Sequence, residues 1–415
     1  MEIDLPKVKK IFFIGIGGIG ISSLAKMALS RGIEVAGVND DESPKTLDPL
    51  VSAGVKISFQ KDNLELPVAD LYVYSDAWIH RGPDILDNAR ATGKPVMNYF
   101  QALGVFAREY KAIAISGTHG KTTTTAMVAG MLIDAGLDPT VVVGSFVKKF
   151  DSNFRLGKGE YLVVEADEYN RHMLELHPYI GAITNIEADH LDCYKDLADI
   201  QSAFDIFISQ SEHKILDYSK YLDKVPKLSV PGEHNRQNAA LALAIADLLH
   251  IDEAVAKKSL QEFTGTWRRL EKIGVTTEGV IVYDDYAHHP TEIKASIQAL
   301  RELYPIGSKN ITVLFQPHLY SRTKALFDDF AKSFTGADKV LLLPIYYARE
   351  AKDESISSEK LAEAISVYDQ YAVAFPSFDE AGNAIKALNL KENDVFVSMG
   401  AGEAYKVAEE IFKIV

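Results

Sequence analysis

Apolar runs alternate with amphipathic stretches along almost the whole chain, and the alternation is clearest at its start. The apolar run KIFFI leads into a glycine-rich turn, then into a stretch with Leu24, Met27 and Ala28 on one helical face, and then into the apolar run EVAGV. The runs LYVYS and PVMNY continue the alternation to about residue 110. Strands that alternate with helices predict a parallel sheet of the dinucleotide-binding type.

Two further blocks of the same kind follow. The second runs from KAIAISGTHGKT through TVVVG and YLVVEADE to YIGAITNIEADH, and the amphipathic stretch GEHNRQNAALALAIADLL follows it. The third comes after FTGTWRRLEKIG and contains GVIVYDDYAHHP, ITVLFQP, KVLLLPI and DVFVSMGAG. The pattern therefore predicts the α/β fold class with three domains, covering residues 1–110, 111–272 and 273–415.

Length and charge narrow the class of protein. A chain of 415 residues is too long for a single core, which agrees with several domains. The formal charge of −14 argues against a protein that coats nucleic acid or an anionic membrane. The single cysteine, Cys193, cannot form an intrachain disulfide, and no apolar run approaches the length of a membrane span. We therefore expect a soluble cytoplasmic protein without a nucleic-acid or membrane partner.

The stretch AIAISGTHGKTTTT contains most of a phosphate-binding loop. A standard loop reads G-x-x-x-x-G-K-[ST], but Ile115 stands where its first glycine would be, so Gly117 and Gly120 bound a shorter turn. In such a turn Lys121 would reach the β- and γ-phosphates of a nucleotide, and the Thr122 hydroxyl would lie on Mg²⁺. The alternative is an ordinary helix cap without a ligand.

Polar side chains end two predicted strands of the same block. Ligands of open α/β sheets bind at the carboxyl ends of the strands, where a magnesium-holding carboxylate is expected. The alternative is a solvated strand end whose side chains cap helices. The two clusters are Glu165, Asp167 and Glu168 after one strand, and Asn185, Glu187, Asp189 and His190 after the other.

An earlier glycine turn, GIGGIG, matches the dinucleotide fingerprint G-x-G-x-x-G through Gly15, Gly17 and Gly20. Taken alone, it favours NAD and a dehydrogenase. A tight strand-to-helix turn without a ligand is the other interpretation.

The chain resembles the Mur ligases of peptidoglycan precursor synthesis over essentially its whole length. The motifs that carry the resemblance occur in order: IGIGGIG, SGTHGKTTTT, EADE, TNIEADHLD, PGEHNRQNAALA, GTWRRLE, DDYAHHPTEI, FQPHLYSRT and GAG. The phosphate loop of this family is itself the short G-T-x-G-K-T form, so Ile115 is no defect. The resemblance implies a Rossmann-like N-terminal domain for a UDP-sugar, a central P-loop ATPase domain and a Rossmann-like C-terminal domain for the incoming amino acid.

The resemblance also implies a reaction, with ATP and Mg²⁺ as cofactors. The best-matching branch activates UDP-N-acetylmuramate as an acyl phosphate and joins it to L-alanine, as a monomer or weak homodimer. Such phosphoryl transfer needs charge neutralisation and positioning rather than a protein nucleophile. A related branch attaches a preformed tripeptide instead. An NAD-dependent oxidoreductase and a nucleotide-sensing module without turnover are the alternatives from other classes.

In the central domain the resemblance assigns ATP to one continuous loop: Gly117, Thr118, His119, Gly120, Lys121, Thr122 and Thr123. It places one Mg²⁺ on Thr122 and Glu165, and it gives His190 as a ligand or organiser of a second. It places adenine beside three side chains, of which Asn235 could equally cap a helix: His234, Asn235 and Asn238.

Near the third domain, Arg269 matches an arginine that reaches the ATP phosphates on domain closure, whereas Arg268 is expected to be only a surface charge. Asp285 is expected to hold ribose or phosphate. The amino-acid and acyl-phosphate site is assigned to Tyr286, His288 and Arg322, with His318 close by, and Arg322 would bind the L-alanine carboxylate. The residues expected to be catalytic are Lys121, Glu165, His190, Arg269 and His288.

In the first domain the glycine turn would hold the diphosphate of the UDP-sugar, with further contacts from Ser22 and Ser75. The turn residues are Gly15, Gly17, Gly18 and Gly20. Asn39 stands where the family usually has an aspartate that binds ribose, and Leu319 stands where many members have an arginine. No lysine follows the DH segment in DLADIQSAFDIFISQ, so we expect none of the carbamylated lysine that several related ligases use for magnesium.

Overall fold

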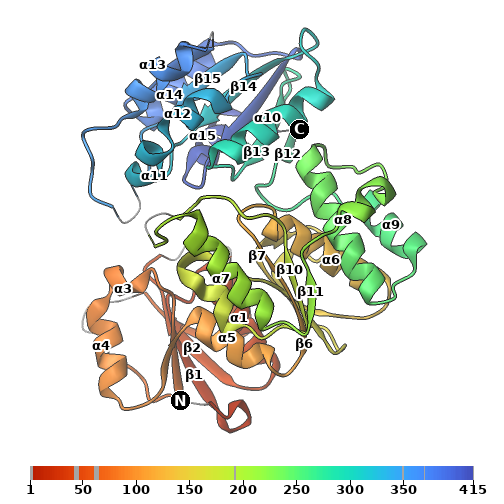
Figure 1. Ribbon diagram of the computed structural model, residues 1–415. Helices are drawn as coiled ribbons and strands as arrows, with labels where there is room; N and C mark the ends of the chain where they lie inside the picture. Colours follow the sequence, from red (N-terminus) through yellow and green to blue (C-terminus); the bar gives the residue numbers. More distant parts are fainter. Residues whose placement is uncertain are drawn as a thin grey trace. The chain divides into compact units, whose positions relative to one another are not determined.

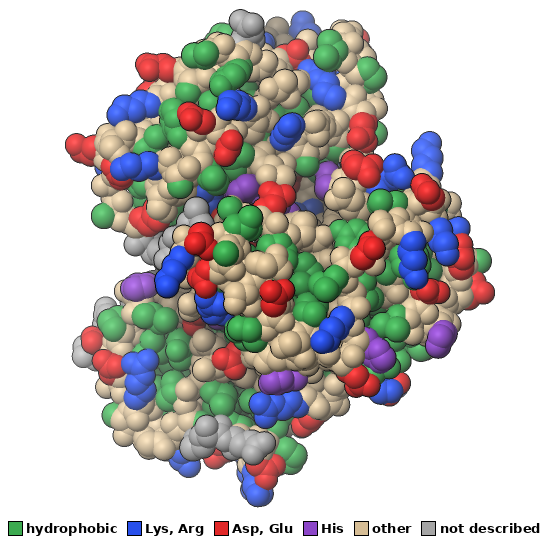
Figure 2. Space-filling view, viewed as in Figure 1, with side chains coloured by type: hydrophobic (Ala, Val, Ile, Leu, Met, Phe, Trp, Pro, Cys, Tyr) green, Lys and Arg blue, Asp and Glu red, His purple; other side chains and the backbone are tan. Residues whose placement is uncertain are grey.

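The computed structural model describes residues 3–41, 46–59, 65–190, 193–347, 350–368 and 370–414. The chain divides into two compact units. Unit 1 comprises residues 1–189, 193–227 and 238–263, and unit 2 comprises residues 190–192, 228–237 and 264–415. Within the described residues, no helix is both long and apolar enough to cross a membrane. Acidic and basic side chains intermingle on the face of the molecule that Figure 2 shows.

The first sheet belongs to unit 1 and has the strand order β3-β2-β1-β4-β5, with every pair parallel, as the alternation of the sequence predicts. Figure 1 labels β1 and β2 of this sheet. Its strands are β1 (Lys10–Ile14), β2 (Glu34–Val38), β3 (Lys56–Ser58), β4 (Leu71–Tyr74) and β5 (Val96–Asn98). Its helices are η1 (Leu5–Lys7), α1 (Ile19–Ser30), α2 (Asp48–Ser52), α3 (Trp78–Arg81), α4 (Pro83–Ala91) and α5 (Tyr99–Ala107). In β1, Ile11 and Phe13 face the core under α1 and α5, whereas Phe12 and Ile14 face the core under α4. This alternation with period two is why helices cover both faces.

The second sheet also belongs to unit 1 and has the order β11-β10-β6-β9-β7-β8, in which only the β7–β8 pair is antiparallel. Its strands are β6 (Lys111–Ser116), β7 (Thr140–Val147), β8 (Ser152–Arg155), β9 (Tyr161–Glu165), β10 (Ile180–Ile183) and β11 (His213–Ile215). Its helices are α6 (Lys121–Asp134), η2 (Tyr169–Glu175), α7 (Leu197–Ser209), η3 (Ser219–Lys224), α8 (Glu233–Leu248) and α9 (Glu253–Glu262), and α8 contributes its first turn to unit 2.

One hydrophobic core joins these two sheets. It continues from Phe13 of β1 and Leu24 of α1, through Phe106 of α5, to Leu162 of β9 and Phe204 of α7. Buried apolar contact of this extent is the main stabilising term of the pair, so the two sheets form one compact unit.

The third sheet lies in unit 2 and has the order β12-β13-β17-β14-β15-β16, in which only the β12–β13 pair is antiparallel. Its strands are β12 (Glu271–Val275), β13 (Ile281–Asp285), β14 (Asn310–Phe315), β15 (Lys339–Leu342), β16 (Tyr371–Ala374) and β17 (Asp394–Met399). Its helices are α10 (Pro290–Leu303), α11 (Tyr320–Ala325), α12 (Phe327–Ser333), α13 (Ser358–Ser366), α14 (Phe378–Ala387) and α15 (Ala404–Ile411). One face packs against α10, α12 and α13, and the other packs against α14 and α15 (Figure 1).

The chain thus has the three-domain α/β architecture that the sequence predicts, with one sheet in each domain. The predicted boundary at residue 272 lies inside β12, which pairs with β13. We therefore place that boundary before β12, and the domain limits remain proposals.

Candidate active site

The turn after β6 has the backbone of a phosphate loop. Gly117 (φ 135°) and Gly120 (φ 82°) both adopt positive φ values, at which a side chain would be strained. A Cβ atom at Gly117 would overlap Thr184 Oγ1, and one at Gly120 would overlap Asn238 Oδ1. Ile115 is completely buried within β6 and belongs to the core. The short loop is therefore complete, because its two glycines stand where the geometry requires them.

The segment after β10 holds this loop in place. Asn185 Oδ1 accepts a hydrogen bond from His119 N (3.0 Å), and Asn185 Nδ2 donates to His119 O (3.0 Å). Thr118 Oγ1 accepts from Glu187 N (2.9 Å). The polar cluster at this strand end thus has a task that its spacing alone did not reveal, which is to fix the backbone of the loop on the neighbouring strand.

Lys121 begins α6 and folds back over the loop. Its Nζ donates to the carbonyl oxygens of Gly117 (2.7 Å) and Thr118 (3.0 Å), and it lies 2.7 Å from Glu168 Oε2. Burial lowers the pKa of Lys121, but the charges of Glu168, Asp167 and Glu165 outweigh it and raise the pKa overall. Lys121 is therefore a fixed positive charge within the turn, where a phosphate would need one.

Thr122 and Glu165 are brought together, as expected of a magnesium site. Thr122 Oγ1 donates to Glu165 Oε1 (2.9 Å), and Glu165 Oε2 accepts from Gly144 N (2.8 Å). A hydroxyl and a carboxylate beside a phosphate loop form a set of hard oxygen donors that fits Mg²⁺. Thr123 follows in the same turn of α6 and is buried.

The adenine and second-magnesium assignments are spread over both units. Asn238 lies in unit 1 against Gly120 of the loop. His234 and Asn235 lie in unit 2, where Asn235 Nδ2 donates to Pro231 O (2.7 Å), in keeping with a structural role at the helix start. His190 has a positive φ of 55° and groups with unit 2. The ligand roles of these residues remain predictions.

The first glycine turn, after β1, is crowded by side chains of its own domain. A Cβ atom would overlap the Trp78 ring at Gly15 (φ 82°), would lie 2.7 Å from Asn39 Nδ2 at Gly17, and would lie 2.8 Å from the Tyr99 ring at Gly20. Gly18 caps α1. The amide N–H groups at the start of a helix can bind a diphosphate, so the turn remains a candidate for that ligand.

The three side chains assigned to the sugar nucleotide differ in burial and in their hydrogen bonds within the protein. Asn39 is 4 % exposed, accepts from Gly17 N (3.0 Å) and donates to Asp41 O (2.6 Å), so its amide shapes the turn. Ser22 is fully buried, and its hydroxyl donates to Ile19 O and accepts from Asn153 Nδ2. Because both groups are occupied within the protein, this arrangement does not favour the substrate contacts expected of Asn39 and Ser22. Ser75 is partly exposed beside Gly15 and remains a candidate.

In unit 2, the residues assigned to the amino acid lie close together. The rings of Tyr286 and His288 are 5.3 Å apart, and those of His288 and His318 are 5.9 Å apart. Arg322 Nη1 lies 3.3 Å from His318 Nδ1. Leu319, where many relatives have arginine, directly precedes α11 with a φ of 72° and is buried. The structure thus brings together the residues that the resemblance assigns to the amino-acid site, and a guanidinium of this kind can bind a carboxylate.

Two neighbours of this cluster carry charge. Asp285 is buried at the end of β13, accepts from Ser296 Oγ and from Ala287 N (3.2 Å), and burial raises its pKa to about 6. Arg269 is partly exposed, and its guanidinium lies 5.2 Å from the centre of the Tyr286 ring. Both residues are therefore near Tyr286, and their contacts with ATP remain predictions.

The expectation that Arg268 is only a surface charge is wrong. Its side chain is 5 % exposed, its Nε donates to Asp284 Oδ2 (2.7 Å), and its other nitrogens donate to Gly400 O (2.7 Å) and Gly402 O (3.3 Å). Arg268 thus ties the start of the domain to β13 and to the GAG turn after β17. The sequence contains two adjacent arginines, and it does not show which of them is buried.

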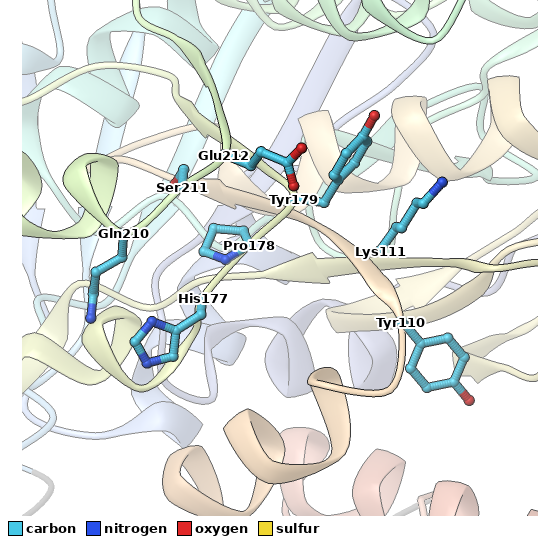
Figure 3. A pocket seen from close by; sticks show the side chains of 8 residues that line it. All are labelled: Tyr110, Lys111, His177, Pro178, Tyr179, Gln210, Ser211 and Glu212. Atoms are coloured by element: carbon cyan, nitrogen blue, oxygen red, sulfur yellow. The ribbon is translucent and has the colours of Figure 1, made fainter.

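A cavity of about 650 Å³ lies elsewhere in unit 1 (Figure 3). It is lined at the start of β6 by Tyr110 and Lys111, at the opposite end of the strand from the phosphate loop. Its side chains point in different directions rather than toward one centre, as Figure 3 shows for His177, Gln210 and Tyr179. None of the predicted site residues lines this cavity, and its side chains do not point toward a common centre.

Comparison with known proteins agrees with the motifs. Residues 10–111 match the model of the Mur ligase family catalytic domain, residues 115–218 match the Mur ligase middle domain, and residues 268–402 match the Mur ligase glutamate ligase domain. A UDP-N-acetylmuramate–L-alanine ligase of Caldanaerobacter subterraneus is 37 % identical and covers 100 % of this chain and 99 % of its own. The enzyme of the same name from Clostridium acetobutylicum is also 37 % identical, with 99 % of each chain covered.

A solved structure gives the same result. The crystal structure of a UDP-N-acetylmuramate–alanine ligase from Thermotoga maritima superposes with a TM-score of 0.80 at 28 % identity, covering 97 % of this chain and 98 % of the other. These relatives give no support to the oxidoreductase alternative. On the phosphate loop, the three sheets and these full-length matches, the chain belongs to the Mur ligase family.

Proposed function

We propose that this chain joins L-alanine to UDP-N-acetylmuramate at the expense of ATP, releasing ADP and phosphate. The observation that carries the proposal is the loop in which Lys121 is paired with Glu168 while Thr122 contacts Glu165. The names of the full-length relatives support the choice of substrates. A cytoplasmic location and a monomeric or weakly dimeric state remain predictions.

The reaction divides into two steps that these residues can serve. In the first, the carboxylate of the sugar nucleotide attacks the γ-phosphate of ATP to form an acyl phosphate and ADP. Lys121 and the N–H groups of the loop would stabilise the charge that develops on the phosphate oxygens. Mg²⁺ bound by Thr122 and Glu165 would neutralise phosphate charge and orient the β- and γ-phosphates.

In the second step, the amine of L-alanine attacks the acyl carbon, and phosphate leaves. Arg322 would bind the L-alanine carboxylate, because a planar guanidinium can donate two parallel hydrogen bonds to it. His288 lies between Tyr286 and His318, in a position to contact the reacting groups. The protein supplies no nucleophile, so orientation and charge neutralisation account for the catalysis.

A substrate panel tests the proposal. We expect release of ADP and phosphate from ATP and Mg²⁺ only when UDP-N-acetylmuramate and L-alanine are both present. Release with a tripeptide, but none above background with L-alanine, would assign the chain to the peptide-adding branch. ATP binding without turnover under any combination would indicate a nucleotide-sensing module.

A further inference from the structure

A buried histidine connects the first and second sheets of unit 1. His172 lies in η2 and is 6 % exposed. Its Nε2 lies 2.8 Å from Asp76 Oδ2, and its Nδ1 lies 3.3 Å from Asp167 Oδ2. Asp76 directly follows Ser75 after β4, whereas Asp167 is the second residue after Glu165 at the end of β9. One imidazole therefore joins an acid beside the first glycine turn to an acid beside the phosphate loop.

The ring of His172 is held by aromatic packing from α5. The Phe100 ring stacks on it at 3.7 Å between centroids and 12° between planes. Tyr99, the preceding residue, lies so close to Gly20 of the first turn that a Cβ there would be 2.8 Å from its ring. A Cβ at Gly104 of α5 would overlap Glu175 O of η2. The stacked Phe100 ring restricts rotation of the imidazole, and the close approach at Gly104 holds α5 and η2 together.

Charge explains why a histidine is suited to this position. Burial lowers the pKa of His172, but the contacts to Asp167 and Asp76 outweigh burial and raise the pKa to about 9. The ring is then an imidazolium at neutral pH. Among the described residues, Asp76 Oδ1 is buried without a hydrogen-bond partner, and the ion pair with His172 is made by the other carboxylate oxygen, Oδ2.

We propose that His172 is a positioning residue that couples the sugar-nucleotide turn of the first sheet to the ATP loop of the second. The inference rests on the proposed function. In that function the carboxylate of UDP-N-acetylmuramate, bound at the first sheet, must meet the γ-phosphate of ATP, bound at the second. By holding Asp76 and Asp167 on one ring, His172 fixes the segment after β4 relative to the segment after β9. Loss of the ring weakens the linkage between the two ligands without removing either binding loop.

A double-mutant cycle tests this coupling in the full chain, with His172→Gln, Asp76→Asn and the double variant. The affinity for ATP is measured by calorimetry with and without UDP-N-acetylmuramate, and kcat and KM are measured with L-alanine present. We expect the sugar nucleotide to tighten ATP binding by about 5-fold or more in the parent, a usual size for a coupling between sites. Each single variant should lose most of that factor and raise the KM for UDP-N-acetylmuramate, while ATP binding alone changes by less than about 3-fold.

The double variant should be no worse than His172→Gln, because loss of the ring already removes the contact that Asp76→Asn breaks. His177→Gln is the matched control, since this exposed histidine follows η2 and takes the same substitution. The coupling role would be overturned if the losses in coupling of the two single variants multiplied in the double variant. It would also be overturned if the single variants behaved like His177→Gln. Should His172→Gln fail to fold, Asp76→Asn alone still tests the prediction, because it removes charge without changing shape. A parent that turns over no UDP-N-acetylmuramate contradicts the proposed function instead, and the calorimetric coupling is read independently of turnover.

Discussion

At the scale of single residues, the charge of Lys121 is the feature on which ATP use depends most. We expect Lys121→Ala to lower turnover by roughly 100-fold or more, the usual effect of removing one charge-stabilising group from an active site. Binding of UDP-N-acetylmuramate should be nearly unchanged, because the first glycine turn belongs to a different sheet. Steady-state phosphate release and calorimetry measure the two effects. Lys214→Ala, an exposed lysine of β11, is the control, and an equal loss there would remove the special role of Lys121.

Gly120 of the phosphate loop is constrained by a neighbouring side chain as well as by its positive φ, unlike an ordinary turn glycine. Gly120 and Gly54 have nearly the same φ, 82° and 80°, but a Cβ at Gly120 would overlap Asn238 Oδ1, whereas Gly54 has open space around it. Gly120→Ala and Gly54→Ala both carry a backbone strain of about 1–3 kcal/mol, because alanine rarely adopts a positive φ. We expect Gly120→Ala to lower the thermal unfolding midpoint further and to weaken ATP binding. Equal midpoints for Gly120→Ala and Gly54→Ala would show that the Asn238 contact costs nothing.

At the scale of elements, Arg268 holds the third sheet together at the point where the chain enters it. Arg268→Ala removes the charged partner of the buried Asp284 and leaves it the hydrogen bond from Ser398 Oγ (2.6 Å). We expect a loss of about 3–5 kcal/mol in the free energy of unfolding of that domain. Arg268→Lys should not restore it, because an ammonium cannot reach Asp284 and the Gly400 carbonyl with the same fork. Denaturant unfolding followed by fluorescence measures the loss. Arg236→Ala, on the exposed face of α8, should leave the transition unchanged.

The start of α8 gives unit 2 a dependence on pH. Burial lowers the pKa of His234 from 6.5 to about 4, although Glu292 opposes the shift. Because the folded protein keeps this ring neutral, its stabilising contribution is complete above about pH 6.5 and is lost as the pH falls toward 4. At about 1.4 kcal/mol for each pH unit, the loss is at most about 3 kcal/mol.

The comparison of parent and His234→Gln isolates this effect from the carboxylates that titrate in the same range. We expect the parent to lose stability more steeply than the variant between pH 6.5 and 4.5 in thermal unfolding. Parallel curves for the two proteins would show that His234 is not buried as a neutral ring.

The elements also show which parts of the fold could be predicted. The central strands were visible as apolar runs because both of their faces are buried. The strands that the sequence did not reveal are β3, β8, β11, β12 and β16. All five are edge strands of their sheets, and they contain partly exposed residues, as β12 does. These five strands span only three to five residues each, which is too short for a clear apolar period in the sequence.

At the scale of the whole molecule, each sheet carries one part of the proposed reaction. We expect removal of divalent cations with EDTA to stop ATP turnover, because Thr122 and Glu165 on the second sheet would hold Mg²⁺. The affinity for UDP-N-acetylmuramate should change by less than about 3-fold, since helix N-terminal N–H groups bind a diphosphate without a metal. Readdition of Mg²⁺ should restore turnover. Loss of sugar-nucleotide binding on chelation would place the metal at the first sheet instead.

The sequence by itself determined the two glycine turns, the central strands and the family, because each depends on residues close together along the chain. A glycine's φ, the period of apolar positions and an ordered series of motifs are all local properties. Only the tertiary structure decided which partner each polar group takes. Glu168 pairs with Lys121, Asp284 pairs with Arg268, and Asn39 turns inward to its own loop. Those choices depend on burial and on neighbouring strands, and a carboxylate looks the same in the sequence whether it binds a ligand or an arginine.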